Sequence, residues 1–310
     1  MPRVSVITPA RDCEPFIGEA LKSVADQTYD DWEMIVADDA STDDTASIAE
    51  AFDPRVTVVR SERNVGPAGA RNLALAHAQG ELVALLDADD YLLPSFLERQ
   101  VGAYDRACEA GDRVGFVTCN AHILTAAGTS NVTYHDIHGL SGELSLERLL
   151  KRNPVFVSSL FPRELLGEVG PFDVDIFGAE DFDLWIRIME RGYRAVVTPE
   201  PLVVYRRWSG ALSTSQATMA RSDRIAYEKA LARGLLGSRA ARIARSRLRH
   251  SRAVEMVATA SSGSRSARRR LVMSLPLILR VALENPRYWL TWTRGAAVRI
   301  LKGSRREYAG

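Results

Sequence analysis

The chain has 310 residues, of which 46% are hydrophobic, so it can bury the core of one or two globular domains and is not a disordered protein. Its 40 Lys and Arg residues nearly balance its 39 Asp and Glu residues, but the two signs are segregated. Residues 1–220 contain 19 basic and 34 acidic side chains, whereas residues 221–310 contain 21 basic and 5 acidic ones. This segregation predicts that the two parts have different partners or roles.

The three cysteines, Cys13, Cys108 and Cys119, form no Cys-x-x-Cys pair and cannot all pair with one another. They indicate neither a disulfide framework nor a zinc site, and they are typical of a reducing cytoplasm. No secretory signal is predicted, because no basic segment precedes the first apolar stretch. No membrane-spanning helix is predicted, since the best apolar run, residues 271–279, is far shorter than the roughly 20 residues that span a bilayer.

The first 107 residues alternate between strand-like and helix-like segments. Strands are expected at residues 4–8, 32–37, 55–59 and 81–86, and helices at residues 14–27, 41–51, 66–78 and 94–107. The second helix has polar side chains before it that can cap its first turn, in Ser41-Thr42-Asp43-Asp44. Such alternation predicts an α/β fold with a doubly wound, mainly parallel sheet.

The pattern is less regular beyond residue 110. We expect a strand at 114–119, a polar loop at 125–142, helices at 144–151 and 180–190, and a strand at 202–205. From about residue 215 the chain is typical of helices rich in Ala, Leu and Arg. These features predict a catalytic or binding domain over residues 1–215 and a basic helical extension over residues 216–310.

The extension carries arginines at spacings of three and four residues, which places them on one face of a helix. They are Arg239, Arg242, Arg245, Arg249 and Arg252. Such a face suits an anionic membrane surface, with Trp289 and Trp292 at the level of the headgroups. The alternative is that the extension packs on the acidic domain, within one chain or across a homodimer. No nucleic-acid-binding motif is present, so nucleic acid is not an expected partner.

The most informative stretch is Leu85-Leu86-Asp87-Ala88-Asp89-Asp90, in which carboxylates directly follow a buried strand. The carboxyl ends of strands are where open α/β sheets bind their ligands. Mg²⁺ takes oxygen ligands, usually one or two carboxylates completed by substrate phosphates and water. The stretch therefore predicts a divalent cation that bridges the protein to a phosphorylated substrate, and the alternative is a solvated acidic turn.

Five short motifs follow one another along the chain. They are Val4-Ser5-Val6-Ile7-Thr8-Pro9; Ser23-Val24-x-x-Gln27-Thr28; Trp32-Glu33-x-Ile35-Val36-x-Asp38-Asp39-x-Ser41-Thr42-Asp43-x-Thr45; Asn64-x-Gly66 with Ala70-Arg71-Asn72; and Asp87-Ala88-Asp89-Asp90. Each motif is weak alone, but in this order and spacing the chain resembles the family 2 glycosyltransferases of GT-A fold over roughly residues 3–210. The last 90 residues lie outside the resemblance.

The resemblance implies an inverting, metal-dependent enzyme that moves a sugar from a nucleotide-sugar donor, expected to be UDP-linked, to a hydroxyl of a glycan or lipid-linked acceptor of the cell envelope. The protein is expected in the cytoplasm, where the basic extension would bring the catalytic domain to such an acceptor at the cytoplasmic face of the membrane. The implied nucleotide-binding residues are Pro9, Ala10, Arg11, Asp39, Arg71, Asp87 and Ala88. By resemblance Asp39 accepts a hydrogen bond from a pyrimidine N–H, and Asp38 supports the turn beside the next helix. Asp89 is the implied ligand of Mg²⁺ or Mn²⁺, with Asp87 facing the ribose or reaching the metal through water.

A general base is implied by a second acidic pair. The stretch Gly178-Ala179-Glu180-Asp181-Phe182-Asp183-Leu184-Trp185 resembles the Glu-Asp motif of the family, in which the aspartate takes the proton of the attacking hydroxyl. We expect Asp181 to be this base, and Glu180 is the alternative. A further alternative is that both carboxylates merely complement the dipole of the helix that they begin. For Arg71, the alternative to nucleotide binding is an ion pair at the protein surface.

The chain departs from the family pattern in two places. Pro9-Ala10-Arg11-Asp12 stands where the family has Pro-x-Tyr-Asn, so no tyrosine is expected to stack on the base. Arg206-Arg207-Trp208 stands where many members have Arg-x-His. Here Arg206 or Arg207 is a candidate for holding the diphosphate, and Trp208 for shaping the sugar or acceptor pocket. His122, His135 and His138 show no ligand spacing and are expected at the surface.

Two other functions are considered beside glycosyl transfer. A nucleotidyltransferase would also use an α/β fold and Mg²⁺, but no glycine-rich phosphate loop follows the first strand. A non-catalytic nucleotide-sugar-binding protein is expected to lack metal or base carboxylates, whereas Asp87, Asp89 and Asp181 are all present.

Overall fold

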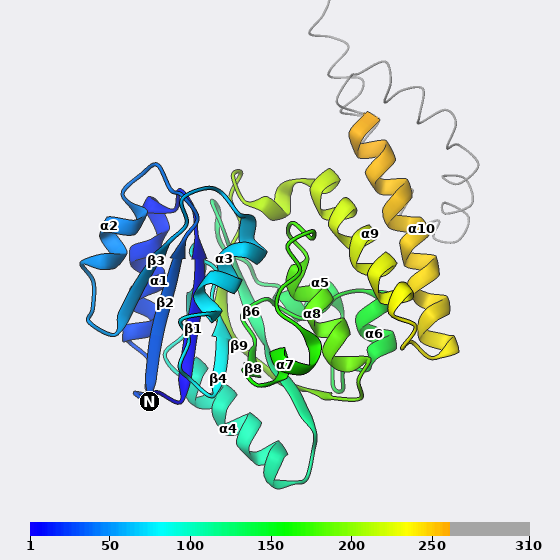
Figure 1. Cartoon of the computed structure of the whole chain (residues 1–310), viewed down its shortest axis with the longest axis horizontal. Helices are drawn as coiled ribbons and strands as arrows, with labels where there is room; N and C mark the ends of the chain where they lie inside the picture. Colours follow the sequence, from blue (N-terminus) through cyan, green and yellow to red (C-terminus); the bar gives the residue numbers. More distant parts are fainter. Residues whose placement is uncertain (261–310) are drawn as a thin grey trace, which may run out of the picture.

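The structure, a computed structural model, describes residues 1–260 and is shown in Figure 1. Within these residues a nine-stranded sheet has the order β3-β2-β1-β4-β8-β6-β9-β5, with β7 paired to β6. The strands are β1 Val4–Ala10, β2 Trp32–Asp38, β3 Val56–Arg60, β4 Leu82–Leu85, β5 Tyr91–Leu92, β6 Val114–Thr125, β7 Gly128–Thr129, β8 Leu160–Pro162 and β9 Arg194–Arg206. The helices are α1 Glu14–Ala25, α2 Thr45–Glu50, α3 Gly66–Leu75, α4 Phe96–Glu109, α5 Tyr134–His138, α6 Leu146–Lys151, α7 Leu165–Val169, α8 Glu180–Met189, α9 Gln216–Arg233 and α10 Ser238–Ala260, with a 3-10 turn, η1, at Leu212–Thr214.

The first four strands confirm the expected α/β architecture. β3, β2, β1 and β4 pair in parallel, and helices connect them. Beyond β4 the sheet becomes mixed, because β8 runs antiparallel to both β4 and β6, whereas β6 and β9 pair in parallel. The parallel half places the carboxyl ends of β1, β2 and β4 at one edge of the sheet, as a doubly wound sheet requires.

Two of the expected strands are much longer in the structure. β6 continues to Thr125, and β9 begins at Arg194 rather than near residue 202. Pro199 and Pro201 obscured β9 in the sequence, since proline cannot donate to a strand ladder. The sheet accommodates them at an irregularity, where the register of β6 against β9 shifts around Asn120.

A short helix, α5, lies in the segment that was expected to be a loop. Its first turn has a capping box, in which the Thr133 hydroxyl and the Asp136 carboxylate each accept from the other residue's backbone N–H. Gly139 ends it in a left-handed conformation with φ 69°. The signals at both ends were present in the sequence, but a helix of one turn has almost no apolar periodicity to reveal it.

The helical extension shares the core of the first domain rather than standing apart. α9 and α10 lie side by side against α6 and α8 (Figure 1), and Ala226, Tyr227, Ala230, Ala240 and Ala244 are buried in one cluster with side chains of α8. The Tyr227 hydroxyl donates to the backbone carbonyl of Leu150 over 2.8 Å. No helix within residues 1–260 is long and apolar enough to cross a membrane.

Part of the positive charge of the extension is matched by nearby acids. Lys229 pairs with Asp173 and Asp175 at 2.6 and 2.8 Å, and Arg252 pairs with Glu228 of α9 at 2.8 Å. By contrast, Arg239, Arg242 and Arg245 are exposed and form no ion pair with another described residue. The apolar run at 271–279, Trp289 and Trp292 lie outside the described residues.

Candidate active site

A cavity of about 560 Å³ lies at the carboxyl ends of β1, β2 and β4. One half of its wall comes from these strand ends and from α3. The other half comes from α5, the start of α8, the segment after β9, and α9. It brings together all of the site residues that the sequence predicts except Arg206 and Arg207.

Asp39 lies at the end of β2 and lines the cavity beside Pro9, Ala10 and Arg11. Its two carboxylate oxygens accept backbone N–H groups of Val65 at 2.6 Å and Gly66 at 2.9 Å. A carboxylate oxygen can accept more than one hydrogen bond, so each retains capacity for a ligand N–H. Asp39 therefore fixes the turn that begins α3 and also lines the part of the cavity where the nucleobase is expected.

Asp38 does not have the supporting role that was expected of it. One of its carboxylate oxygens is buried with no hydrogen-bond partner among the described residues. The turn before α2 is held instead by Asp43, which accepts from the backbone N–H groups of Glu14 and Thr45, and by Asp12, which accepts from Thr42. No described residue donates a hydrogen bond to the Asp38 side chain, so the expected support of the turn comes from Asp43 and Asp12 instead.

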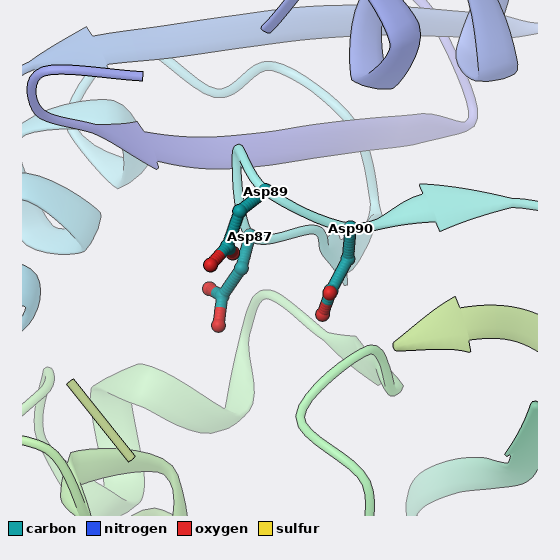
Figure 2. A group of neighbouring side chains, drawn as sticks. All are labelled: Asp87, Asp89 and Asp90. Atoms are coloured by element: carbon teal, nitrogen blue, oxygen red, sulfur yellow. The ribbon is translucent and has the colours of Figure 1, made fainter. Parts of the chain in front are cut away.

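The acidic turn after β4 gathers three carboxylates. One ligand oxygen from each of Asp87, Asp89 and Asp90 lies within 4.8 Å of the others, and Figure 2 shows the three side chains on the same side of the turn. Burial, and then the negative charge of Asp87, raises the pKa of Asp89. Burial raises the pKa of Asp90 well above its usual value. Grouped carboxylate oxygens with this mutual repulsion fit a hard divalent cation.

Two groups from the end of β9 hold this turn in place. The backbone N–H of Arg206 donates to Asp90 over 2.8 Å, and the indole N–H of Trp208 donates to Asp89 over 2.8 Å. Asp90 is thus largely committed to the protein, whereas Asp87 and Asp89 line the cavity. Of the three, Asp89 and Asp87 are the residues that could hold a metal ion from the cavity side.

Arg71 is buried in α3 and joins two parts of the site. Its guanidinium donates to Asp87 and to Glu180, and only 3% of its side chain is exposed. The surface ion pair considered from the sequence is therefore wrong. A planar guanidinium can bind two carboxylates at once, which a lysine cannot do in the same way.

Glu180 and Asp181 begin α8, but only one of them is free. Glu180 is buried, and its oxygens accept from Arg71 and from the backbone N–H of Gly178, the latter over 2.9 Å. Asp181 lines the cavity and has no side-chain partner among the described residues. Burial raises the pKa of Asp181, and the positive charge of Arg71 acts in the opposite direction. The geometry thus favours Asp181 as the proton acceptor and gives Glu180 a supporting position.

In the Arg206-Arg207-Trp208 segment, only Trp208 lines the cavity. The Arg206 guanidinium contacts the Asp89 backbone carbonyl at 2.9 Å and the Glu19 carboxylate, and it does not line the cavity. Arg207 is exposed and also lies outside the lining. Trp208 lines the cavity and packs against Phe16, with ring centroids 5.1 Å apart.

Sequence analysis missed the residues of the second half of the cavity. Tyr134 and His138 of α5 stack with centroids 4.0 Å apart, and Asp223 of α9 faces the same space. The expectation of surface histidines was wrong for His138, and for His135, which is buried. Burial lowers the pKa of His138 to about 4, so this ring is neutral at physiological pH. No spacing in the sequence links α5 to α9, which are about 80 residues apart.

The sequence profile named "Glycosyl transferase family 2" matches residues 5–168, which is more than half of the chain. The chain belongs to this family. It is therefore a glycosyltransferase, as the resemblance implied, and the nucleotidyltransferase and non-catalytic alternatives are not favoured.

Two relatives are named for roles in envelope polysaccharides. The chain is 31% identical over 233 residues, 74% of this chain and 88% of the relative, to a Bacillus subtilis protein named putative teichuronic acid biosynthesis glycosyltransferase TuaG. It is 31% identical over 189 residues, 60% of this chain and 70% of the relative, to the Escherichia coli UDP-Glc:alpha-D-GlcNAc-diphosphoundecaprenol beta-1,3-glucosyltransferase WfgD. This glycosyltransferase is thus related to enzymes of cell-envelope polysaccharide biosynthesis.

Solved structures have the same fold. S. aureus TarS 1–349, solved with UDP-GlcNAc, superposes with a TM-score of 0.64 at 21% identity, over 91% of this chain and 79% of that one. The mannosyltransferase PcManGT from Pyrobaculum calidifontis, solved with GDP-Man and Mn²⁺, superposes with a TM-score of 0.61 at 26% identity. The match covers 99% of this chain and 87% of that one. The longer TarS chain is covered only to 44%. The GT-A-like α/β fold with a C-terminal helical region is thereby confirmed.

Proposed function

We propose that this glycosyltransferase moves a sugar from a UDP-linked donor to a hydroxyl of a cell-envelope glycan or lipid-linked acceptor, with inversion and with a divalent cation. The observation that carries the proposal is one cavity lined by Asp39, Asp89 and Asp181. Asp39 can bind the nucleobase, Asp89 can bind a cation at the diphosphate, and Asp181 can accept the proton of the attacking hydroxyl.

The donor half of the cavity can bind a nucleoside diphosphate. Asp39 accepts from the ring N–H of a pyrimidine, and Pro9, Ala10 and Arg11 form the wall beside it. Asp89, with Asp87, would hold Mg²⁺ or Mn²⁺, which supplies positive charge to the leaving diphosphate. The indole N–H of Trp208 donates to one Asp89 oxygen, which leaves the other oxygen for the cation. The Mn²⁺ in the PcManGT complex is consistent with this assignment.

Asp181 acts on the acceptor side. It accepts the proton of the attacking hydroxyl while the sugar–phosphate bond breaks on the opposite face of the anomeric carbon, so an α-linked donor gives a β-linked product. Burial raises the pKa of Asp181 and so brings it closer to neutral pH, where a general base is most effective. Arg71 binds Glu180 and Asp87, and in this way keeps the base and the diphosphate site at a fixed separation.

The acceptor class is inferred from the relatives and from the charge of the extension. The name of WfgD includes a diphosphoundecaprenol-linked sugar as its acceptor. Arg239, Arg242 and Arg245 are exposed along the first turns of α10, and each basic residue near an anionic leaflet contributes about 1 kcal/mol to binding. These arginines support peripheral binding at the cytoplasmic face, where a lipid-linked acceptor would be reached.

A donor screen tests the proposal. Release of nucleoside diphosphate is measured with Mn²⁺ and each of UDP-glucose, UDP-N-acetylglucosamine, UDP-galactose and GDP-mannose, together with the melting temperature in each mixture. We expect stabilisation and turnover with at least one UDP-sugar, and neither in the Asp89→Ala variant. A preference for GDP-mannose would contradict the role of Asp39, and no response to any donor would contradict the proposed function. The anomeric configuration of the product, determined by NMR, tests inversion.

A further inference from the structure

Asp223 lies in the part of the chain beyond the family match, yet it lines the same cavity as Asp181. It comes from α9, on the wall opposite the nucleotide half. Its carboxylate accepts no hydrogen bond from any other residue within 1–260, although both oxygens could accept several. A carboxylate that faces a cavity without a protein donor is available to a ligand hydroxyl.

The position of Asp223 is fixed by contacts on both sides of it along α9. The Ser222 hydroxyl donates to the Phe177 carbonyl over 2.6 Å, and the Tyr227 hydroxyl donates to the Leu150 carbonyl over 2.8 Å. The Tyr227 ring also meets Phe182 edge-on, with centroids 5.5 Å apart. Phe182 follows Asp181 directly, so these contacts hold Asp223 at a set place relative to the base.

Burial and nearby charges set the protonation of Asp223. Burial is the largest influence and, with the negative charge of Asp181, raises the pKa of Asp223 to about 6, while the positive charge of Arg247 of α10 acts in the opposite direction. Arg247 also interacts with the Tyr227 hydroxyl. Arg247 is not among the residues that line the cavity, whereas Asp223 is.

Aromatic side chains line this half of the cavity. Tyr134 stacks on His138, and Phe156 and Tyr205 pack against each other with centroids 5.4 Å apart; all four line the cavity. Aromatic rings offer apolar faces for the C–H groups of a sugar ring, while a carboxylate accepts from its hydroxyls in strong charge-assisted hydrogen bonds. This combination fits a sugar. A phosphate group would be repelled by the carboxylates of Asp181 and Asp223.

We propose that Asp223 is a positioning residue for the acceptor, and that the acceptor is a sugar seated between α5 and α9. The Asp223 carboxylate accepts a hydrogen bond from a hydroxyl near the one that Asp181 deprotonates, and so directs the nucleophile toward the anomeric carbon. This inference rests on the proposed function. It assigns part of the acceptor site to α9, a helix outside the family match.

The test separates acceptor binding from donor chemistry. UDP release from the UDP-sugar that the donor screen identifies is measured with Mn²⁺, in water alone and with p-nitrophenyl glycosides of glucose, galactose and N-acetylglucosamine. The proteins compared are the full-length wild type, Asp223→Asn, Asp223→Ala and Glu228→Gln. Glu228 is a matched control, because it is a carboxylate of α9 that pairs with Arg224 and Arg252 instead of lining the cavity.

We expect the best glycoside to show a KM about ten- to a hundredfold higher in Asp223→Ala, the effect of losing a hydrogen bond to a charged group. The KM for the UDP-sugar and the rate of its hydrolysis in water should stay within twofold of wild type, and Glu228→Gln should match wild type throughout. An unchanged acceptor KM in both Asp223 variants would overturn the proposal. Equal losses of hydrolysis and transfer in the Asp223 variants would also overturn it, because they indicate a structural role. The same holds if no glycoside stimulates UDP release by the wild type. Absence of both hydrolysis and thermal stabilisation with every sugar nucleotide of the donor screen would instead contradict the proposed function.

Discussion

The guanidinium of Arg71 joins Asp87, on the turn after β4, to Glu180, at the start of α8. It thereby connects the donor half of the cavity to the helix that carries the base. Neither Arg71 nor Glu180 exposes more than 5% of its side chain, so removal of one partner leaves a buried charge without compensation. Such a loss is costly in proteins, whereas loss of an exposed pair is not.

We therefore expect Arg71→Met to lower the free energy of unfolding by about 3–5 kcal/mol, measured by urea denaturation. Arg71→Lys should lie between wild type and Arg71→Met, because one ammonium group cannot make both contacts in the guanidinium geometry. Arg60→Met is the control, since Arg60 and its partner Glu50 are both about half exposed, and it should change stability by less than about 1 kcal/mol. An equal, small effect of the two Met variants would show that Arg71 does not bridge the site.

Metal removal should abolish nucleotide binding. Without a cation, Asp87 and Asp89 repel the diphosphate of UDP. Calorimetric titration with UDP and Mn²⁺ should show binding that EDTA eliminates, and Asp89→Ala should behave like the chelated wild type. Asp26→Asn, which alters an exposed carboxylate paired with Lys22, should bind normally. Equal affinity with and without EDTA would exclude the proposed role of Asp89.

Asp223 should reduce stability at neutral pH. Its pKa is raised from 3.8 to about 6, with burial as the largest cause, so folding binds a proton between those pH values and stability falls as pH rises through about 6. Asp223→Asn removes this effect. It should be more stable than wild type at pH 8, by about 1–3 kcal/mol, with a difference that shrinks toward zero below about pH 4. Thermal melts across this range measure it, and an Asn variant that is less stable at pH 8 would contradict the environment described for Asp223.

The exposed arginines of α10 provide a test of membrane binding. Replacement of Arg239, Arg242 and Arg245 by Ser should release the protein from anionic vesicles in co-sedimentation at low salt, while neutral vesicles should not bind wild type. Arg99, Arg106 and Arg113, which are exposed near α4, supply the control triple variant. Substitution is preferable to deletion of residues 221–310, because α9 and α10 bury side chains in the core. No binding of wild type to anionic vesicles at low salt would contradict the membrane account.

The sequence allowed most of the donor half to be predicted and little of the acceptor half. Asp39 and Asp89 follow strands with clear apolar runs, so their place at the sheet edge follows from local pattern alone. The engagement of Glu180 by Arg71 depends on a contact 109 residues apart along the chain, which no local pattern encodes. The cavity wall formed by Tyr134, His138 and Asp223 likewise depends on tertiary structure, because it combines a one-turn helix with residues of α9 about 80 residues further along the chain.

The central claim is that Asp181 is the base of a glycosyl transfer from a donor bound beside it. The most direct measurement is a comparison of Asp181→Asn with wild type for two quantities, the affinity for UDP with Mn²⁺ and the turnover of the UDP-sugar that the screen identifies. The substitution removes proton acceptance and almost no volume, so UDP affinity should stay within a fewfold while turnover falls by about two to four orders of magnitude. Asp175→Asn, an exposed carboxylate in the preceding loop, should leave both quantities unchanged. Retention of more than about a tenth of wild-type turnover in Asp181→Asn would contradict the account.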